Sequence, residues 1–352
     1  MSLLDEAAPV RDGENLDARR LGEYLAAHLP GLAMPLAVRQ FPSGFSNLTY
    51  LLMTGSRELV LRRPPKGTRP QSGHDMGREF RVLSALQGVF AESPRPLHLC
   101  ADESVIGAPF YVVERIRGII LRRDYPPELE PTPTLVRAQH CALIDTLARL
   151  HGLDHYALGL GDFGRPEGYV ARQLEGWSAR YARALTGDTA CADAVTHWLA
   201  ANRPPDTTPA VLIHNDYKLD NVVFDSAFPA RLIGVLDWEM ATVGDPWMDL
   251  GCSLAYWIEA GDPGELLESR MLPTHLPGSL TRPEVVQRYA SARAVAAPEF
   301  RFYRVFGLFR LAVIVQQIYY RFFHGQTRDP RFAALGPMAR VLIASAAAET
   351  RA

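Results

Sequence analysis

The spacing of apolar residues divides the chain into a first part rich in strands and a second part rich in helices. Leu21, Leu25 and Leu29 recur at helical spacing after a polar start and predict an amphipathic helix over Asp17–Leu29. A second helix is expected over Met76–Leu86. Short apolar runs separated by turn residues predict four strands, over Ala37–Phe41, Thr49–Thr54, Glu58–Arg62 and Pro109–Glu114.

From Gly118 onward the helical period dominates. The strongest helix is expected over Thr134–His151, with a buried side formed by Leu135, Ala138, Ala142, Ile144, Leu147 and Leu150. Further helices are expected over Arg172–Ala184, over Thr189–Ala200 and over most of the chain after Trp247. Three strand-like segments interrupt the helices, and the last two flank a turn as a hairpin: Val211–Ile213, Asn221–Phe224 and Leu232–Leu236.

This change of character predicts an α+β fold with two lobes. A small antiparallel β-rich lobe, with its leading helix and one further helix, is expected over residues 1–113. A hinge is expected over 114–118, followed by a larger helical C-terminal lobe over 119–352. Polar residues of functional interest fall in the second of these lobes.

Composition narrows the classes of protein that fit. The 352 residues are 47% hydrophobic and carry a formal net charge of -2, which gives no support for a nucleic-acid partner. The longest apolar stretch, Phe302–Phe323, is interrupted by arginine and glutamine, so a buried helix is expected there and no membrane span. The N-terminus lacks the pattern of a secretory signal, and the four cysteines are scattered. We therefore expect a cytoplasmic protein without a zinc site or disulfide framework.

The basic residues are almost all arginine. Of 37 basic residues, only Lys66 and Lys218 are lysines. Lysine carries a compact charge, whereas arginine presents a wide planar fork, so the two do not substitute freely beside a phosphate. Lys218 is therefore a candidate for a role that arginine cannot fill.

The segment from His214 to Asp249 holds the residue types that phosphoryl transfer requires. A carboxylate must accept the proton of an attacking hydroxyl, hard oxygen ligands must hold Mg²⁺, and a cation must offset the charge of the phosphate. Asp216 is the candidate base, Lys218 the candidate cation, and Asn221 and Asp237 the candidate Mg²⁺ ligands. An ordinary polar surface loop is the alternative. It is disfavoured because the loop lies between apolar strands, which would bring its side chains together.

These residues carry a resemblance to a known family. The pattern His-x-Asp-x-Lys-x-x-Asn, followed by an Asp at a strand end, resembles the catalytic loop and metal-binding residue of kinases. The chain is more similar to the aminoglycoside phosphotransferase-like family. Within it, LDWEMATVGDPWMDLG and FRLAVIVQQIYYR resemble the kinase-like domain associated with acyl-CoA dehydrogenases and its stand-alone bacterial relatives. The resemblance runs from about Leu36 to about Gly325 and implies a protein-kinase-like fold with ATP and Mg²⁺ as cofactors.

The resemblance also implies positions for the nucleotide. Gly44 and Ser46 would lie over the phosphates, and Arg62, with Glu79 as its partner, would stand where protein kinases have a lysine–glutamate pair. The carbonyl of Glu114 and the amide of Ile116 would face the adenine edge.

Several residues near the candidate loop are given supporting roles. His214 is expected to bond the loop backbone, Asp245 to cap a helix starting at Pro246, and Asp249 to bond back to the loop. Glu239 is left open between contact with metal or substrate and exposure to solvent. Asn215 stands where the family usually has glycine.

The acceptor is expected to be a small hydroxylated anion. Residues 251–352 hold eight acidic and twelve basic residues, a balance that disfavours a polycation such as an aminoglycoside. The narrower resemblance implies a hydroxyacyl-CoA and a functional link to an acyl-CoA dehydrogenase. An aminoglycoside or amino-alcohol kinase and a non-catalytic nucleotide-binding pseudokinase are the alternatives. A protein kinase is disfavoured, because only eleven residues separate Asp237 from Asp249, too few for a peptide-docking segment.

Overall fold

The computed structural model describes residues 3–42, 47–65, 75–327 and 329–351. The chain forms two compact units. The first comprises Met1–Ile120, Pro126–Glu128 and Asn221–Ala241, and the second comprises Leu121–Tyr125, Leu129–Asp220 and Thr242–Ala352. Residues 221–241 therefore group with the N-terminal part of the chain although they follow the loop of Asp216 and Lys218 in sequence. The lobe boundaries at 113 and 119 and the hinge between them stay a prediction.

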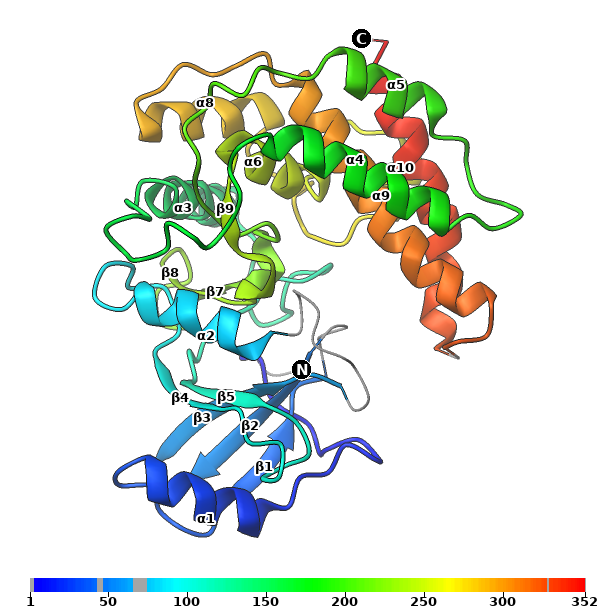
Figure 1. The fold of residues 1–352 in the computed structure, drawn as a ribbon. Helices are drawn as coiled ribbons and strands as arrows, with labels where there is room; N and C mark the ends of the chain where they lie inside the picture. Colours follow the sequence, from blue (N-terminus) through cyan, green and yellow to red (C-terminus); the bar gives the residue numbers. More distant parts are fainter. Residues whose placement is uncertain (1–2, 43–46, 66–74, 328, 352) are drawn as a thin grey trace. The chain divides into compact units, whose positions relative to one another are not determined.

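The first unit is built on a five-stranded antiparallel sheet, drawn in blue and cyan in Figure 1. Its strands, in spatial order, are β1 (Ala37–Gln40), β2 (Leu48–Thr54), β3 (Arg57–Arg63), β5 (Phe110–Glu114) and β4 (Pro96–Cys100). A two-residue turn joins β2 to β3, and Gly55 takes a φ of 57° there, a conformation that favours glycine. The edge strand β4 was not expected from the sequence. It starts at a proline and contains a register shift between Pro96 and His98, which hides the alternating pattern.

Two helices cover the sheet on opposite faces. Helix α1 (Ala18–His28) is capped by Asp17 and packs Leu21 and Leu25 against a core that includes Leu61 of β3. Neighbouring residues of a strand point to opposite faces, so Arg62 points away from that core. Arg62 meets helix α2 (Met76–Ala85) on the other face.

A hairpin of β7 (Val222–Phe224) and β8 (Leu232–Val235) completes the first unit, as predicted. It is tied to the N-terminal part by a bridge between Ile119 and Phe224 and by a hydrogen bond from the Val235 N–H to the Glu92 carbonyl, 2.7 Å long. The short helix η3 (Trp238–Met240) follows β8.

The second unit is mainly helical (Figure 1). Its long helix α9 (Arg301–Phe323) contacts α4 (Tyr169–Arg183), α5 (Asp193–Ala201), α6 (Pro246–Ala255) and α10 (Leu335–Glu349). Helix α3 (Pro133–Leu150) packs against α8 (Arg282–Arg293), and α7 (Gly264–Glu268) is short. Strands β6 (Val211–Ile213) and β9 (Thr242–Gly244) form a two-stranded ladder.

The buried side of α3 differs from the expected one. Ile144, Leu147 and Leu150 are buried as predicted, but Leu135, Ala138 and Ala142 are only partly buried. Gln139, His140 and Thr146 are buried in addition. The buried face of this helix includes polar residues with specific partners, and the spacing of apolar residues alone could not reveal them.

Helices α6 and α9 cross with their backbones in contact. A side chain at Gly251 would collide with the Tyr303 carbonyl, and one at Gly307 would collide with the Gly251 carbonyl. Only glycine permits this approach, so the two glycines fix the point at which α9 crosses α6. Positions one turn further along α9 are thereby placed near the loop that follows β6.

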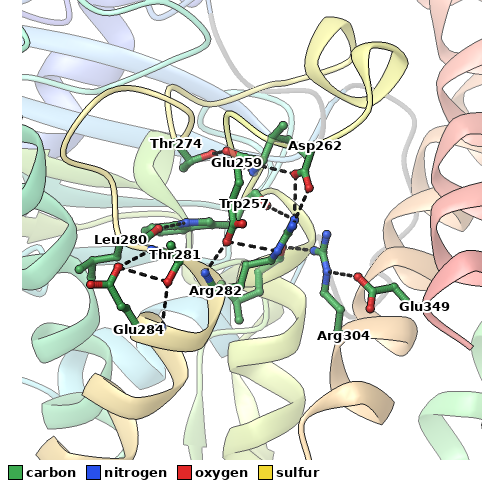
Figure 2. A network of polar contacts seen from close by, with 12 residues as sticks. Trp257, Glu259, Asp262, Thr274, Leu280, Thr281, Arg282, Glu284, Arg304 and Glu349 are labelled. Atoms are coloured by element: carbon green, nitrogen blue, oxygen red, sulfur yellow. Dashed lines mark hydrogen bonds and ion pairs between the residues drawn. The ribbon is translucent and has the colours of Figure 1, made fainter. Parts of the chain in front are cut away.

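A polar network fastens the loop between α6 and α8 (Figure 2). Arg282 binds both oxygens of Asp262, at 2.6 and 2.9 Å, and Trp257 donates to the Leu280 carbonyl at 2.8 Å. Arg304 of α9 reaches Glu349 of α10 at 3.6 Å. The network ties the last two long helices to this loop.

One described segment, Pro330–Glu349, is long and apolar enough to cross a membrane when judged by length and composition alone. Its Leu342, Ile343 and Ala346 are buried, and α10 packs along α9. The stretch Phe302–Phe323, expected as a buried helix, lies within α9, whose first two thirds are buried.

Candidate active site

In the first unit, a buried ion pair joins the sheet to α2. Arg62 of β3 donates to Glu79 of α2 at 2.7 Å, so the predicted pair is present. Glu79 has a relative accessibility of 2%, and burial raises the pKa of its carboxyl although Arg62 acts in the opposite direction. A buried carboxylate of this kind requires the guanidinium beside it.

Arg62 also binds the segment that follows β8. The same guanidinium donates to Asp237 at 2.7 Å and to Glu239 at 3.3 Å. Burial alone lowers the pKa of Arg62, but the three carboxylates and Tyr111 raise it well above its ordinary value. Three carboxylates around one guanidinium leave an excess of negative charge, which suits a divalent cation.

Asp237 takes a left-handed backbone conformation, with φ 67° and ψ 59°. Its side chain is the most exposed of the three carboxylates, at 33%, against 12% for Glu239 and 1% for Glu79. The neighbouring Trp238 is buried and donates to the Val235 carbonyl at 2.8 Å, which fixes the turn. Asp237 is thus the carboxylate that a ligand can reach.

Asn221 lies in the same unit. Its carbonyl accepts a hydrogen bond from the N–H of Leu236, at 2.8 Å, which brings it beside the residue that precedes Asp237. Asn221 and Asp237 supply an amide and a carboxylate oxygen, the hard donors that Mg²⁺ prefers. Among the described residues no group of three or more His, Cys, Asp or Glu is arranged to hold a metal. This set fits an ion that takes most of its ligands from phosphate and water.

Glu239 is held by two side chains of its own unit, and its contact with metal or substrate stays a prediction. It accepts from Asn47 at 2.6 Å as well as from Arg62. Asn47 was not singled out as a site residue, although it directly follows the segment of sequence that holds Gly44 and Ser46. Those two residues lie outside the described part of the chain.

In the second unit, the loop after β6 is held through its backbone. Asp249 of α6 accepts from the N–H groups of His214 and Asn215, both at 2.8 Å, and contacts His151 Nε2 at 3.1 Å. Although burial raises it, the net pKa of Asp249 is lowered, because these partners favour the carboxylate. The expected bond from Asp249 to the loop is confirmed, whereas His151 had been taken only as the end of α3.

Asn215 also takes a left-handed conformation, with φ 65°. Asparagine and glycine are the two residues that adopt this region most readily, so asparagine can stand where the family usually has glycine. The His214 side chain accepts from the Asp216 N–H at 3.3 Å, in the supporting role expected for it. Asp245 caps α6 at Pro246 as predicted.

Asp216 and Lys218 form a close pair at 2.6 Å, and Asp220 lies 3.4 Å from the same ammonium. Burial lowers the pKa of Lys218, but the two carboxylates outweigh it and the pKa is raised, so the lysine is a cation. Its ammonium lies 5.4 Å from the centre of the Tyr256 ring. A fixed cation next to a carboxylate suits a site that handles phosphate.

The residues expected near adenine lie at the end of the sheet. Glu114 ends β5, and its N–H donates to the Arg95 carbonyl at 3.0 Å. The side chain of Ile116 lies close to Gly234 of the hairpin. Their contacts with a nucleotide stay a prediction.

The comparisons with known proteins agree with this arrangement. A model of the phosphotransferase enzyme family matches residues 37–271. Acyl-CoA dehydrogenase family member 11 of Gallus gallus is 34% identical over 334 residues, which is 92% of this chain and 42% of that protein. Acyl-CoA dehydrogenase family member 10 of Mus musculus is 35% identical, over 90% of this chain and 30% of that protein. The chain thus spans less than half the length of these curated relatives.

Solved structures show the same fold. A putative aminoglycoside phosphotransferase from Ralstonia eutropha has a TM-score of 0.81 and 30% identity, over 96% of this chain and 99% of that one. Choline kinase from Cryptosporidium parvum has a TM-score of 0.62 at 11% identity, over 95% of this chain and 96% of that one, which shows the fold alone. The α+β, kinase-like fold expected from the sequence is confirmed. The chain belongs to the phosphotransferase enzyme family.

Proposed function

We propose that this chain transfers the γ-phosphoryl group of ATP, with Mg²⁺, to a hydroxyl group of a small anionic molecule in the cytoplasm. The observation that carries the proposal is the pair of Asp216 and Lys218, on a loop whose backbone is fixed by Asp249. Several structures with the same fold are described with ADP or with ATP bound, which supports a nucleotide as the donor.

The proposed reaction needs little covalent chemistry from the protein. The acceptor oxygen forms a bond to the γ-phosphorus, the bond to the bridging oxygen of ADP breaks, and the hydroxyl proton passes to Asp216. Lys218 offsets charge on the transferring group. Asn221 and Asp237 would hold Mg²⁺, which when bound neutralises charge on the phosphate oxygens.

Arg62 would serve the nucleotide in the same unit as the metal ligands. Its guanidinium already binds Glu79 and Asp237, and a phosphate oxygen is a partner of the same kind as a carboxylate oxygen. Gly44, Ser46, Glu114 and Ile116 complete the proposed nucleotide set. The alternative of a non-catalytic pseudokinase was suggested by Arg62 and Asn215, and the defined partners of both residues favour the catalytic alternative.

The acceptor class is argued from the charge of the C-terminal region and from the names of the relatives. Residues 251–352 contain twelve basic and eight acidic residues. All twelve basic residues are arginines, and several of them are already paired with carboxylates, among them Arg270, Arg282, Arg288, Arg331 and Arg340. The curated relatives are named as acyl-CoA dehydrogenase family members. The acceptor we propose is a hydroxyacyl-CoA. We also propose a functional link to an acyl-CoA dehydrogenase.

A second acceptor class has an observation of its own. The structure from Ralstonia eutropha, at 30% identity, is described as a putative aminoglycoside phosphotransferase. An aminoglycoside or another amino alcohol is therefore the alternative.

A competition experiment separates the two classes. The enzyme is incubated with Mg-ATP and equal concentrations of a 4-hydroxyacyl-CoA, its free acid and an aminoglycoside, and phosphorylated products are quantified by mass spectrometry. Preferential phosphorylation of the thioester supports the proposal. Preferential phosphorylation of the aminoglycoside overturns the acceptor class and leaves the phosphotransferase intact. Phosphorylation of none of them, by an enzyme that binds Mg-ATP, would contradict the proposed reaction for these acceptors.

A further inference from the structure

Arg310 of α9 is a buried cation that no carboxylate neutralises directly. Its relative accessibility is 5%, and within the described part of the chain it forms no ion pair at 4.0 Å or less. Its Nη2 donates to the carbonyl of Asn215 at 2.8 Å, and its guanidinium lies 5.1 Å from the centre of the Trp177 ring. Burying a cation is costly unless the protein supplies compensating partners, so this arrangement calls for an explanation.

The partner of Arg310 is the residue that immediately precedes the candidate base. Three polar groups of Asn215 are each held by a different helix. Its N–H donates to Asp249 of α6, its carbonyl accepts from Arg310 of α9, and its side chain accepts from Tyr169 of α4 at 3.2 Å. A left-handed conformation costs a non-glycine residue about 1–2 kcal/mol, and these bonds keep the residue there.

Arg304 provides a comparison on the same helix. It is equally buried, at 5%, and also donates to a backbone carbonyl, that of Leu254 at the end of α6. It belongs to the network of Figure 2, beside Arg282 and Glu349, and its hydrogen bond and ion pair in the described part of the chain go to Leu254 and Glu349, not to the loop after β6.

The two arginines differ in their electrostatic surroundings. Burial, together with Arg282, lowers the pKa of Arg304 to about 10. Burial lowers the pKa of Arg310 too, but Cys252, Tyr256, Asp216 and Tyr169 raise it above its ordinary value. Arg304 is therefore a structural cation within a network of helices, whereas Arg310 is stabilised by the loop and its neighbours.

We propose that Arg310 is a positioning residue for phosphoryl transfer, which holds Asn215 in its left-handed conformation and thereby places the carboxylate of Asp216. The inference rests on the proposed function, because Asp216 is the base only if the chain transfers a phosphoryl group. The close crossing at Gly251 and Gly307 sets the position of α9 from which Arg310 reaches the loop.

The test compares Arg310→Gln with the matched variant Arg304→Gln. We expect R310Q to lower kcat about 10–100-fold, since a small misplacement of a reacting group has effects of that size, and to leave the dissociation constant of Mg-ATP within about twofold. We expect R304Q to lower the melting temperature and to keep kcat. Arg310→Lys keeps the charge without the planar fork, so its kcat should fall between those of R310Q and the wild type.

Several results would overturn the proposal. One is an R310Q protein with wild-type kcat, and another is a loss of kcat equal to that of R304Q at the same folded fraction. If R310Q does not fold, R310K decides: a lowered kcat with unchanged Mg-ATP affinity supports the role, and an unchanged kcat refutes it.

A structural readout separates this inference from the proposed function. If the wild type transfers no phosphate to any acceptor, the proposed function fails before a variant is compared. A crystal structure of R310Q, or of R310K, then still tests the positioning role. We expect Asn215 to leave the left-handed region or its loop to lose order. A loop unchanged from that of the wild type would contradict the role assigned to Arg310.

Discussion

The two units hold their candidate functional residues in different ways. In the first unit, Arg62 connects Glu79, Asp237 and Glu239 through side-chain ion pairs. In the second, the residues around Asp216 are fixed through the backbone of His214 and Asn215. The first arrangement joins charged side chains to one another, and the second joins a loop to three helices.

The Arg62 ion pairs can therefore exchange partners when a ligand binds, whereas the loop before Asp216 already has its final conformation without a ligand. An arginine bound to carboxylates can accept phosphate oxygens instead, because both present the same acceptor geometry. The backbone N–H groups that donate to the buried Asp249 are enclosed with their acceptor, so a ligand does not offer them an alternative partner. We therefore expect nucleotide and metal to alter the contacts of Arg62 and to leave the loop before Asp216 unchanged.

The largest effect is expected from Asp216→Asn. The variant keeps the shape of the side chain but cannot accept the hydroxyl proton, and general-base assistance contributes about 10²–10⁴-fold. Single-turnover transfer with the acceptor should fall by that factor. Asp225→Asn, which removes a carboxylate from the β7–β8 turn, serves as the control and should transfer like the wild type.

A large loss of stability is expected from Asp249→Asn. Its carboxylate accepts two backbone N–H groups and contacts His151, and breaking a buried charged contact costs about 3–5 kcal/mol. Urea unfolding measures the change in free energy. Asp245→Asn on the same helix is the matched control, because asparagine caps a helix about as well as aspartate. Equal stability of the two variants would show that the contacts of Asp249 with the loop and with His151 contribute little to the free energy of unfolding.

A smaller effect on nucleotide binding is expected from Glu79→Gln. It weakens a charge-assisted bond to Arg62, worth about 1.5–3 kcal/mol, so affinity for Mg-ATP should fall about 10–100-fold while transfer at saturating ATP falls less. Calorimetry gives the affinity. The control, Glu58→Gln, removes the 3.0 Å ion pair with Arg115 elsewhere in the same unit. Should both variants bind alike, Arg62 would not depend on Glu79.

The last effect, the smallest per unit of change, concerns pH and a residue away from the site. His140 of α3 is buried against Trp257, and burial lowers its pKa to about 3. Below about pH 6.5 the unfolded chain binds a proton that the folded chain does not, so stability is complete above that pH and falls toward pH 3. The slope should approach about 1.4 kcal/mol per pH unit.

Urea unfolding between pH 7 and pH 4 measures this slope. His140→Phe should flatten the dependence, whereas the exposed His197→Gln should keep it. A slope that His140→Phe leaves unchanged would assign the acid sensitivity to other groups.

The sequence predicted the features that depend on neighbouring residues along the chain. The amphipathic helix after Asp17 followed from the spacing of its leucines, and the capping of α6 by Asp245 followed from residue type and position. The hairpin β7–β8 and the pairing of Arg62 with Glu79 were also predicted, the latter from the family resemblance.

Features set by distant packing were not predictable in the same way. Strand β4 was missed because its proline and its register shift disturb the alternation. The buried side of α3 includes His140, whose partners Trp257 and Leu280 lie far along the chain. The left-handed Asn215 depends on bonds from three helices, none of them adjacent in sequence.

Arg310 left a signal in the sequence that could not be assigned. It is one of several arginines within the apolar stretch of α9, and nothing in the pattern of residues separates it from Arg304. The structure separates them by their acceptors, the Asn215 carbonyl for one and the Leu254 carbonyl for the other.

The most direct test of the division between the two parts is Mg-ATP binding to two variants, measured by calorimetry with and without Mg²⁺. Asp237→Ala should lose the Mg²⁺-dependent part of the affinity, because it removes the most accessible carboxylate of the first part. Asp216→Asn should bind Mg-ATP like the wild type and fail only in transfer. Unchanged, Mg²⁺-dependent binding by Asp237→Ala, or lost binding by Asp216→Asn, would contradict the account.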